Sequence, residues 1–261
     1  MARPRARWLP LSLPRRLVAE ALRACRGVPT VTAERRMDLG ELAEARRAWA
    51  TRPAWSAIHA RAFALVAAER PALRRSFVRW PWPHLYEHPE PVAAVVVERD
   101  YRGEEAVFFA QLRRPHLRPL AELDAALRHA QTAPLAEVAS FRKALRLARL
   151  PWPLRPAAMW VGLHASGRLR ERGLGTFSLS SPAAQGAGML HLLTALTATL
   201  HYGLFDRDGR LDMRLTFDHR VLDGATAARA LAAMEAALRG PLLAELLEIR
   251  GQKSEVRKQA V

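Results

Sequence analysis

Cysteine is almost absent from this chain of 261 residues, which has only Cys25. A single cysteine excludes an intrachain disulfide framework and any cysteine-rich metal site. Such a composition is typical of a reducing compartment, so we expect a cytoplasmic protein without a metal. Long apolar runs are absent too, because Arg, Glu or Pro interrupts each one before the roughly 18 residues that a membrane helix needs. We therefore expect a soluble protein without a membrane partner.

Lysine is also scarce, although positively charged residues are abundant. The chain has 41 Lys and Arg residues against 25 Asp and Glu, a net charge of +16, and 38 of the positive residues are arginine. A positive field suits nucleic acid, an acidic membrane, an acidic partner or a phosphate-bearing small molecule. The arginines are scattered along the chain among many alanines, and no nucleic-acid motif accompanies them. Nucleic acid is therefore the least favoured partner.

The sequence also lacks internal repeats, flexible linkers and the glycine-rich motifs of nucleotide-binding and hydrolase folds. Its 50% hydrophobic content is enough for one sizeable core. We predict a basic arm at residues 1–10, one folded domain at 11–249 and a flexible polar tail at 250–261. A transit peptide is the alternative interpretation of the arm.

Hydrophobic periodicity predicts a mixed α+β order of elements. We expect helices over residues 15–26, 39–49 with Asp38 as N-cap, 55–70, from 119 onward, 135–150 and 225–239. We expect strands over residues 28–39, 92–98, 106–112, 175–180, 195–204 and 211–217. Residues 79–91 hold four prolines and are predicted to be a loop.

Polar residues are concentrated where the last strand meets the last helix. The strand alternates strictly, with apolar residues at 211, 213, 215 and 217, and it continues into Asp218, His219, Asp223 and Gly224. A lone histidine in such a turn is more often structural than catalytic. Here the rigid elements on both sides favour a cleft with functional side chains.

The segment FDHRVLDGATAARAL, residues 217–231, resembles the D-H-R-x-x-D-G signature of the 2-oxoacid dehydrogenase acyltransferases. These dihydrolipoamide acyltransferase catalytic domains share the fold of chloramphenicol acetyltransferase. Three further segments are similar to the family in the same order: LPLSLPRRLVAEAL, VPTVTAERRMDLGELAEAR and GTFSLSS. Condensation-type relatives have a second histidine where this chain has Asp218, which favours the lipoyl branch.

The resemblance implies an α+β, chloramphenicol acetyltransferase-like two-layer sandwich, with a mixed sheet and helices packed on one face. It implies a homotrimer whose active sites lie between neighbouring subunits. The implied reaction moves an acyl group between coenzyme A, as a substrate, and a thiol such as dihydrolipoamide. Only about ten residues precede the match, so we expect any lipoyl group to come in trans.

By the same resemblance, His219 is the general base, since an ordinary imidazole has a pKa of about 6.5 and can take a thiol proton. Ser180 is implied to stabilise the oxyanion. Ser178 shares its face of the strand, and Ser181 is the weaker candidate.

Asp223 is implied to brace the histidine loop by pairing with Arg15, or alternatively Arg16. It could also cap the helix that follows. Gly224 is expected to permit a close backbone approach.

Several features depart from the family or remain outside it. Thr30 and Arg74 replace a family histidine and asparagine and are candidates for altering the thiol channel. The short interval between Ser180 and His219 favours a trimer over the large cubic or dodecahedral assemblies. The Trp-Pro clusters at 80–83 and 151–153 are predicted to be rigid surface or interface segments. The alternatives are a catalytically silent trimeric scaffold or regulatory subunit and a basic nucleic-acid-binding protein.

Overall fold

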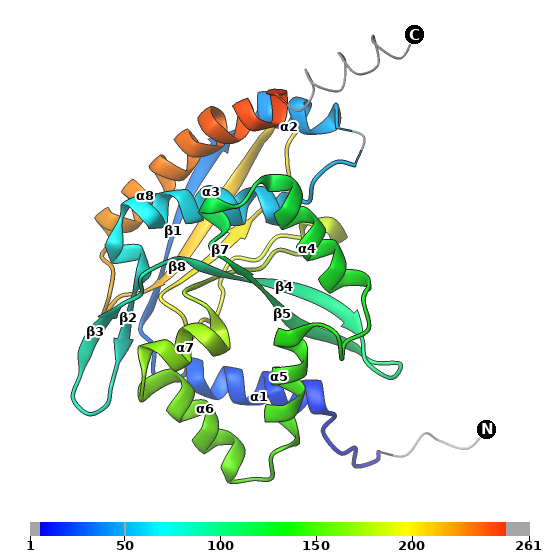
Figure 1. Cartoon of the computed structure of the whole chain (residues 1–261), viewed down its shortest axis with the longest axis vertical. Coiled ribbons are helices and arrows are strands. Elements are labelled where there is room, and N and C mark those ends of the chain that lie inside the picture. The colour runs from blue at the N-terminus through cyan, green and yellow to red at the C-terminus, as the bar shows by residue number, and fades with distance from the viewer. Residues whose placement is uncertain (1–5, 50, 249–261) are drawn as a thin grey trace.

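The computed structural model describes residues 6–49 and 51–248, so the predicted tail at 250–261 and half of the predicted arm lie outside the described residues. A six-stranded mixed sheet forms the centre, with the strand order β1-β8-β7-β6-β4-β5 (Figure 1). The strands are β1 Thr30–Asp38, β4 Val92–Asp100, β5 Glu105–Arg113, β6 Phe177–Leu179, β7 Ala198–Tyr202 and β8 Arg210–Asp218. Only β6 pairs in parallel, with β4 on one side and β7 on the other.

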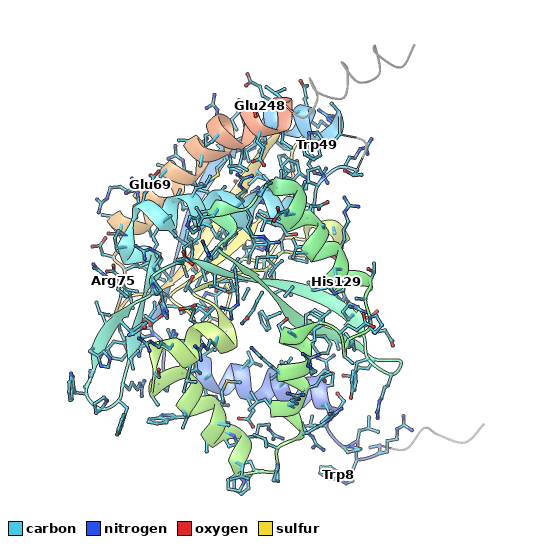
Figure 2. All side chains as sticks on the ribbon, viewed as in Figure 1. Trp8, Trp49, Glu69, Arg75, His129 and Glu248 are labelled. Atoms are coloured by element: carbon cyan, nitrogen blue, oxygen red, sulfur yellow. The ribbon has the colours of Figure 1, made fainter. Side chains whose placement is uncertain are left out.

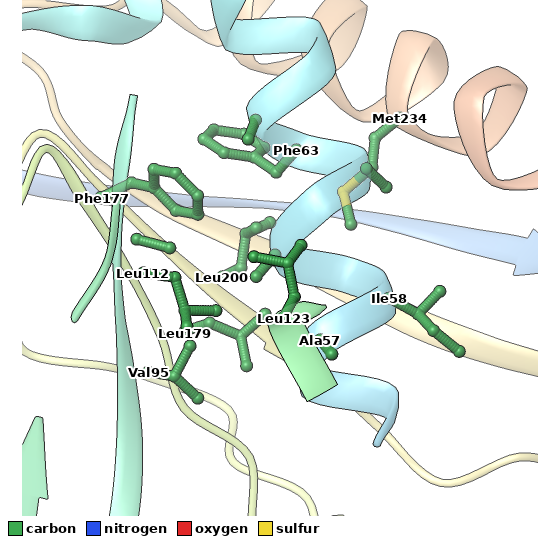
Figure 3. Packing of buried hydrophobic residues seen from close by; sticks show 14 of the residues in the cluster. Ala57, Ile58, Phe63, Val95, Leu112, Leu123, Phe177, Leu179, Leu200 and Met234 are labelled. Atoms are coloured by element: carbon green, nitrogen blue, oxygen red, sulfur yellow. The ribbon is translucent and has the colours of Figure 1, made fainter. Parts of the chain in front are cut away.

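One face of the sheet is covered by α3 Trp55–Glu69, α4 Leu120–Thr132 and α8 Gly224–Ala237. The sequence of α3 is apolar on nearly every side, and a helix of that kind is stable only when it is buried all round. Phe63 of α3 packs against Phe177 of β6 with ring centroids 4.8 Å apart, at the centre of the core (Figure 3). The predicted strands and these helices are confirmed.

A second group of helices packs beyond the β5 edge, in the lower part of Figure 1. It comprises α1 Leu13–Cys25, α5 Ala139–Arg149, α6 Leu154–His164 and α7 Gly167–Leu174. α5 connects this group to the sheet. Its Phe141 packs against Phe108 of β5 with ring centroids 4.9 Å apart, and its other side shares a small core with α1 and α6. The prediction of helices on one face holds for α3, α4 and α8, whereas α6 and α7 were not predicted.

The predicted loop at 79–91 is partly wrong. β3 His84–Glu87 lies inside that region and forms an antiparallel hairpin with β2 Arg75–Val78, which precedes it. Pro83 and Pro89 flank β3 and do not interrupt it, so no ladder hydrogen bond is lost. The base of the hairpin is closed by Arg74, whose guanidinium donates to the carbonyls of Ala67, His88 and Pro89.

The remaining elements are short. They are α2 Gly40–Arg47, three 3-10 turns at Pro71–Arg74, Pro115–Leu117 and Ala183–Gln185, and a π turn at Leu238–Leu242. Asp38 ends β1 and is not the cap of α2, since Leu39 occupies that position. Within residues 6–49 and 51–248, no helix is long and apolar enough to cross a membrane.

Three histidines are held neutral by their surroundings. Burial lowers the pKa of His59 to about 3. Burial and nearby guanidinium groups lower the pKa of His88 and His164 to about 4. Their ordinary pKa in an unfolded chain is about 6.5, so on acidification the unfolded state binds protons before the folded state does.

The free energy of unfolding is therefore expected to be highest above pH 6.5 and to fall as the pH drops from about 6.5 toward 4. His59 alone contributes about 1.4 kcal/mol per pH unit in that window. Urea unfolding across the window measures the slope, which His59→Leu should flatten. The exposed His191 provides the control, since His191→Leu should leave the slope unchanged; a free energy that does not fall below pH 6.5 would contradict the prediction.

Candidate active site

Buried charged side chains hold the loop between β8 and α8 in place. Asp218 is fully buried, and its carboxylate accepts three hydrogen bonds from Arg220, one from the backbone N–H and two from the guanidinium, at 2.7–3.0 Å. The Arg220 guanidinium also lies over the Phe77 ring at 4.3 Å and donates to the Gly27 carbonyl. The motif residues on either side of His219 therefore tie its loop to the end of α1 and to β2.

A second arginine, missed in the sequence, completes this anchor. Arg170 of α7 is only 2% exposed and donates to the carbonyls of Phe77, Leu163 and Ala195. Burial lowers its pKa to about 10, with Asp218 opposing the shift and Arg220 adding to it. The element that carries Arg170 was not predicted, so only the three arginines within residues 168–172 could have drawn attention to it.

His219 is fixed through its backbone while its imidazole is free. Its N–H donates to the Pro29 carbonyl at 2.9 Å, just before β1 begins. Its ring is exposed and lies 5.8 Å from the Phe217 ring. Neither ring nitrogen has a hydrogen bond to the part of the chain that the structure describes. The side chain can therefore accept a proton from a molecule bound at the surface.

Asp223 does not pair with Arg15, so the predicted brace is wrong within this chain. Arg15 pairs with Glu104 at 3.0 Å, and Arg16 donates to the Leu11 carbonyl. Asp223 instead caps α8, accepting from the Thr226 N–H at 2.7 Å. The cap lowers the pKa of Asp223, and the charges of Arg229 and of His219 lower it further. An ionised carboxylate thus stands within electrostatic reach of the imidazole.

Gly224 also differs from its prediction. A Cβ added at Gly224 would meet no atom within 4 Å, so no close backbone approach requires glycine there within residues 6–49 and 51–248. Gly175, just before β6, does have a steric role, because it has a φ of +87° and an added Cβ would lie 2.8 Å from the Val92 carbonyl oxygen. It allows the chain to turn from α7 into β6.

Asp223→Ala is expected to lower the stability of the fold, because α8 loses its cap. Because Asp223 is exposed and has no ion pair among the described residues, the loss should be well below that of breaking a buried ion pair. Chemical denaturation measures the difference. Asp223→Asn keeps the cap and should be nearly neutral, whereas a large loss of stability in both variants would restore the ion-pair interpretation.

The three serines of the β6 segment have different partners. The Ser178 hydroxyl is buried and hydrogen-bonds the Thr199 hydroxyl at 2.6 Å. The Ser181 hydroxyl donates to the Tyr202 carbonyl and accepts from the Ala183 N–H. The Ser180 hydroxyl has no hydrogen bond among the described residues and borders a cavity of about 930 Å³. Ser180 is therefore the one of the three that is available to a ligand.

His201 is a buried residue that positions Ser180. Its Nε2 accepts from the Met189 N–H, so the ring proton is on Nδ1, which donates to the Ser180 carbonyl; both contacts are 2.9 Å. Burial lowers the pKa of His201, which keeps this neutral tautomer. The two bonds tie β7 to the residue after β6 and to the segment between the two strands.

Ser180 and His219 lie far apart in one chain. Leu179 pairs with Leu200 of β7, so the next residue, Ser180, lies level with His201. His201 in turn pairs with Arg214 of β8. His219 is five residues beyond Arg214, which is about 17 Å along the strand direction. The structure therefore does not bring the two predicted residues together within one chain.

Cys25 ends α1, and its thiol is partly buried. Burial raises the pKa of this thiol, which disfavours the thiolate.

No protein-family model matches the chain, and no curated protein matches its sequence. Solved structures do match. The chain is 20% identical to a dihydrolipoamide acetyltransferase of Azotobacter vinelandii, with a TM-score of 0.66 over 93% of this chain and 94% of that one. A probable dihydrolipoamide acetyltransferase of Listeria monocytogenes matches at 15% identity and a TM-score of 0.64, over 90% of this chain and 94% of that one.

A third match is a truncated catalytic core of the 2-oxoacid dehydrogenase multienzyme complex from Thermoplasma acidophilum. It is 15% identical with a TM-score of 0.62, over 90% of this chain and 99% of that core. The chain has the fold of these dihydrolipoamide acetyltransferase cores. The predicted α+β class with a mixed sheet is thereby confirmed, and the matches cover nine-tenths of the chain or more.

Proposed function

We propose that this chain is an acyltransferase that moves an acyl group between coenzyme A and a thiol such as dihydrolipoamide. The observation that carries the proposal is the free imidazole of His219 on a loop whose backbone is rigidly anchored. A general base needs this combination, because its nitrogen must reach the reacting proton without a competing partner. The acetyltransferase-core fold supports the same reaction.

In the proposed step, His219 takes the S–H proton of the acceptor thiol as the sulfur attacks the thioester carbonyl. The new C–S bond forms, and the carbonyl oxygen becomes an oxyanion. When the intermediate collapses, the bond to the coenzyme A sulfur breaks and the imidazolium returns its proton to that sulfur. The nearby Asp223 carboxylate stabilises the transient positive charge on the ring.

We assign the oxyanion contact to Ser180 of a neighbouring protomer. The distance between Ser180 and His219 within one chain supports a shared site, and the unpartnered hydroxyl supports the role. A homotrimer offers three equivalent sites of this kind. The catalytic mechanism of the Azotobacter enzyme involves a serine, a histidine and an asparagine four positions after the histidine. Asp223 lies four positions after His219.

The cavity beside Ser180 is a candidate for the coenzyme A arm. Trp55 and Tyr202 contribute aromatic walls, and Arg46, stacked over Trp55 at 4.8 Å, contributes positive charge. An arginine suits phosphate, because its guanidinium can donate two parallel hydrogen bonds. Coenzyme A would act here as a substrate, and a lipoyl group could be presented by a partner protein.

The test is incubation with a panel of acyl-CoA thioesters and free dihydrolipoamide. Transfer between thiols leaves the total number of thiols unchanged, so chromatography must resolve acyl-dihydrolipoamide from acyl-CoA. We expect product with at least one member of the panel. A trimeric protein that turns over no thioester with thiol, amine or hydroxyl acceptors would support the silent-scaffold alternative and contradict the proposal.

A further inference from the structure

α5 turns a basic row of side chains toward solvent. Its exposed residues, apart from Ala139, are Arg142, Lys143, Arg146 and Arg149. Residues 138–170 contain seven basic residues and not one Asp or Glu. None of the four forms an ion pair with the residues that the structure describes. This row is therefore a local concentration of unneutralised positive charge.

α6, which follows through the Pro151–Pro153 turn, exposes only apolar side chains. They are Leu154, Ala157, Ala158, Trp160 and Val161, and Trp152 in the turn is 70% exposed. The spacing of Leu154, Ala158 and Val161 places them along one side of the helix. The opposite side already packs inward through Met159 and Leu163. The exposed row is thus an apolar surface without a partner among residues 6–49 and 51–248.

The β2–β3 hairpin places two more tryptophans at the end of the molecule that carries α6. The backbone N–H of Trp80 donates to the His164 carbonyl at the end of α6, and the side chains of Trp80 and Trp82 are 56% and 67% exposed. The hairpin turn and α6 both lie in the lower part of Figure 1. Trp8 also lies in the lower part of the molecule, far from Trp49 and Glu248 (Figure 2). Trp80 thus lies beside the end of α6, at the end of the molecule where Trp8 also lies.

We propose that the α5–α6 face, defined by the basic row of α5 and the apolar row of α6 with Trp152, binds the surface of a membrane that contains anionic phospholipid. Indole rings settle at the level of lipid headgroups, and basic residues are attracted to an anionic leaflet. At 11 residues α6 is about 16 Å long, too short to span a bilayer, so it would lie in the plane of the interface.

The side chains favour lipid over the other anionic partners. Leucine, valine and alanine bury well among acyl chains, whereas the bases of a nucleic acid would stack only on the tryptophans of this face. No membrane partner was predicted from the sequence, because the apolar and basic residues form separate surfaces only after α5 and α6 have folded.

The experiment is flotation of the purified chain with two kinds of vesicle, phosphatidylcholine alone and phosphatidylcholine mixed with phosphatidylglycerol. We expect binding to the mixed vesicles only, weakening as salt is added. Arg146→Ser with Arg149→Ser should reduce the partition coefficient about 30-fold, since each basic residue near an anionic surface is worth roughly a factor of five. Trp152→Ser with Leu154→Ser should reduce it by about tenfold or more.

Matched controls carry the same changes elsewhere on the surface. Arg207→Ser with Arg239→Ser removes two exposed arginines outside the face and should weaken flotation only slightly, through the lower net charge. Leu117→Ser removes an exposed leucine outside the face and should leave flotation unchanged. All changes are at exposed positions, and an unaltered melting temperature confirms folding. A direct readout is quenching of tryptophan fluorescence by brominated acyl chains, which should fall in Trp152→Phe with Trp160→Phe.

Three outcomes would overturn the proposal. The first is no flotation with anionic vesicles. The second is an oligomer that dissociates when Trp152 and Leu154 are changed, which would make the face a contact between copies. The third is binding to RNA or DNA that depends on Arg146 and Arg149 and is indifferent to Trp152. None of these readouts depends on acyl transfer, so the proposed function can fail or hold separately.

Discussion

Replacing His219 by alanine is expected to lower kcat by roughly 10² to 10⁴, the range that loss of a general base usually costs. The imidazole is exposed and makes no hydrogen bond within the described residues, whereas the loop is held by the backbone N–H of His219 and by Asp218 and Arg220. The variant should therefore keep its fold. Acyl transfer is measured with the best thioester of the panel, and stability by thermal unfolding.

The matched control is His191→Ala, which removes another exposed histidine. It should leave both rate and stability unchanged. A pH profile separates a base from a merely structural residue, since a general base gives the native enzyme an acid limb that disappears from the residual activity of His219→Ala. Full activity in His219→Ala would eliminate the assignment of His219.

Replacing Ser180 by alanine is expected to lower kcat by about 10² to 10³, the cost of one oxyanion donor. The hydroxyl groups of Ser178 and Ser181 are already engaged with Thr199 and Tyr202. Ser178→Ala and Ser181→Ala should therefore act on stability more than on kcat. A larger loss of kcat in Ser181→Ala than in Ser180→Ala would show that the wrong serine had been assigned.

Mixing the two inactive variants tests whether the site is shared. Each shared site takes His219 from one protomer and Ser180 from the next. In trimers reassembled from equal amounts of His219→Ala and Ser180→Ala, about a quarter of the sites receive both native residues by chance. The mixture should therefore recover about a quarter of the native activity. A site contained within one chain would recover none. The recovery, measured after unfolding and refolding the mixture, must exceed that of either variant refolded alone.

Local patterns determined much of this protein. Strict alternation at residues 211–217 gave a strand because side chains two apart share one face of a sheet. The apolar sequence of residues 55–69 gave a helix buried on nearly every side. The D-H-R-x-x-D-G segment located His219 at a strand-to-helix turn, since the motif, the alternation and the following helix are all contiguous in sequence.

The partners of charged residues required the tertiary structure. Arg15 was expected beside Asp223, but α1 points it toward Glu104 of the β4–β5 hairpin. Asp223 found its partner three residues away in Thr226. Arg170, the buried cation below the histidine loop, belongs to a helix whose sequence looks like an exposed arginine-rich segment. Long side chains can reach several neighbours, and only the packing of whole elements selects among them.

The sequence by itself thus determined the order of strands and main helices, the position of His219 and the choice of the serine strand, because these depend on contacts between near neighbours along the chain. Only the tertiary structure decided that, among the described residues, Ser180 alone of three serines has a free hydroxyl, that it lies far from His219 of the same chain, and that α5 exposes basic and α6 apolar side chains. Each of these depends on the register of strands or the packing of helices distant in sequence, where the stabilising energy comes from burial and hydrogen bonds that no local pattern specifies.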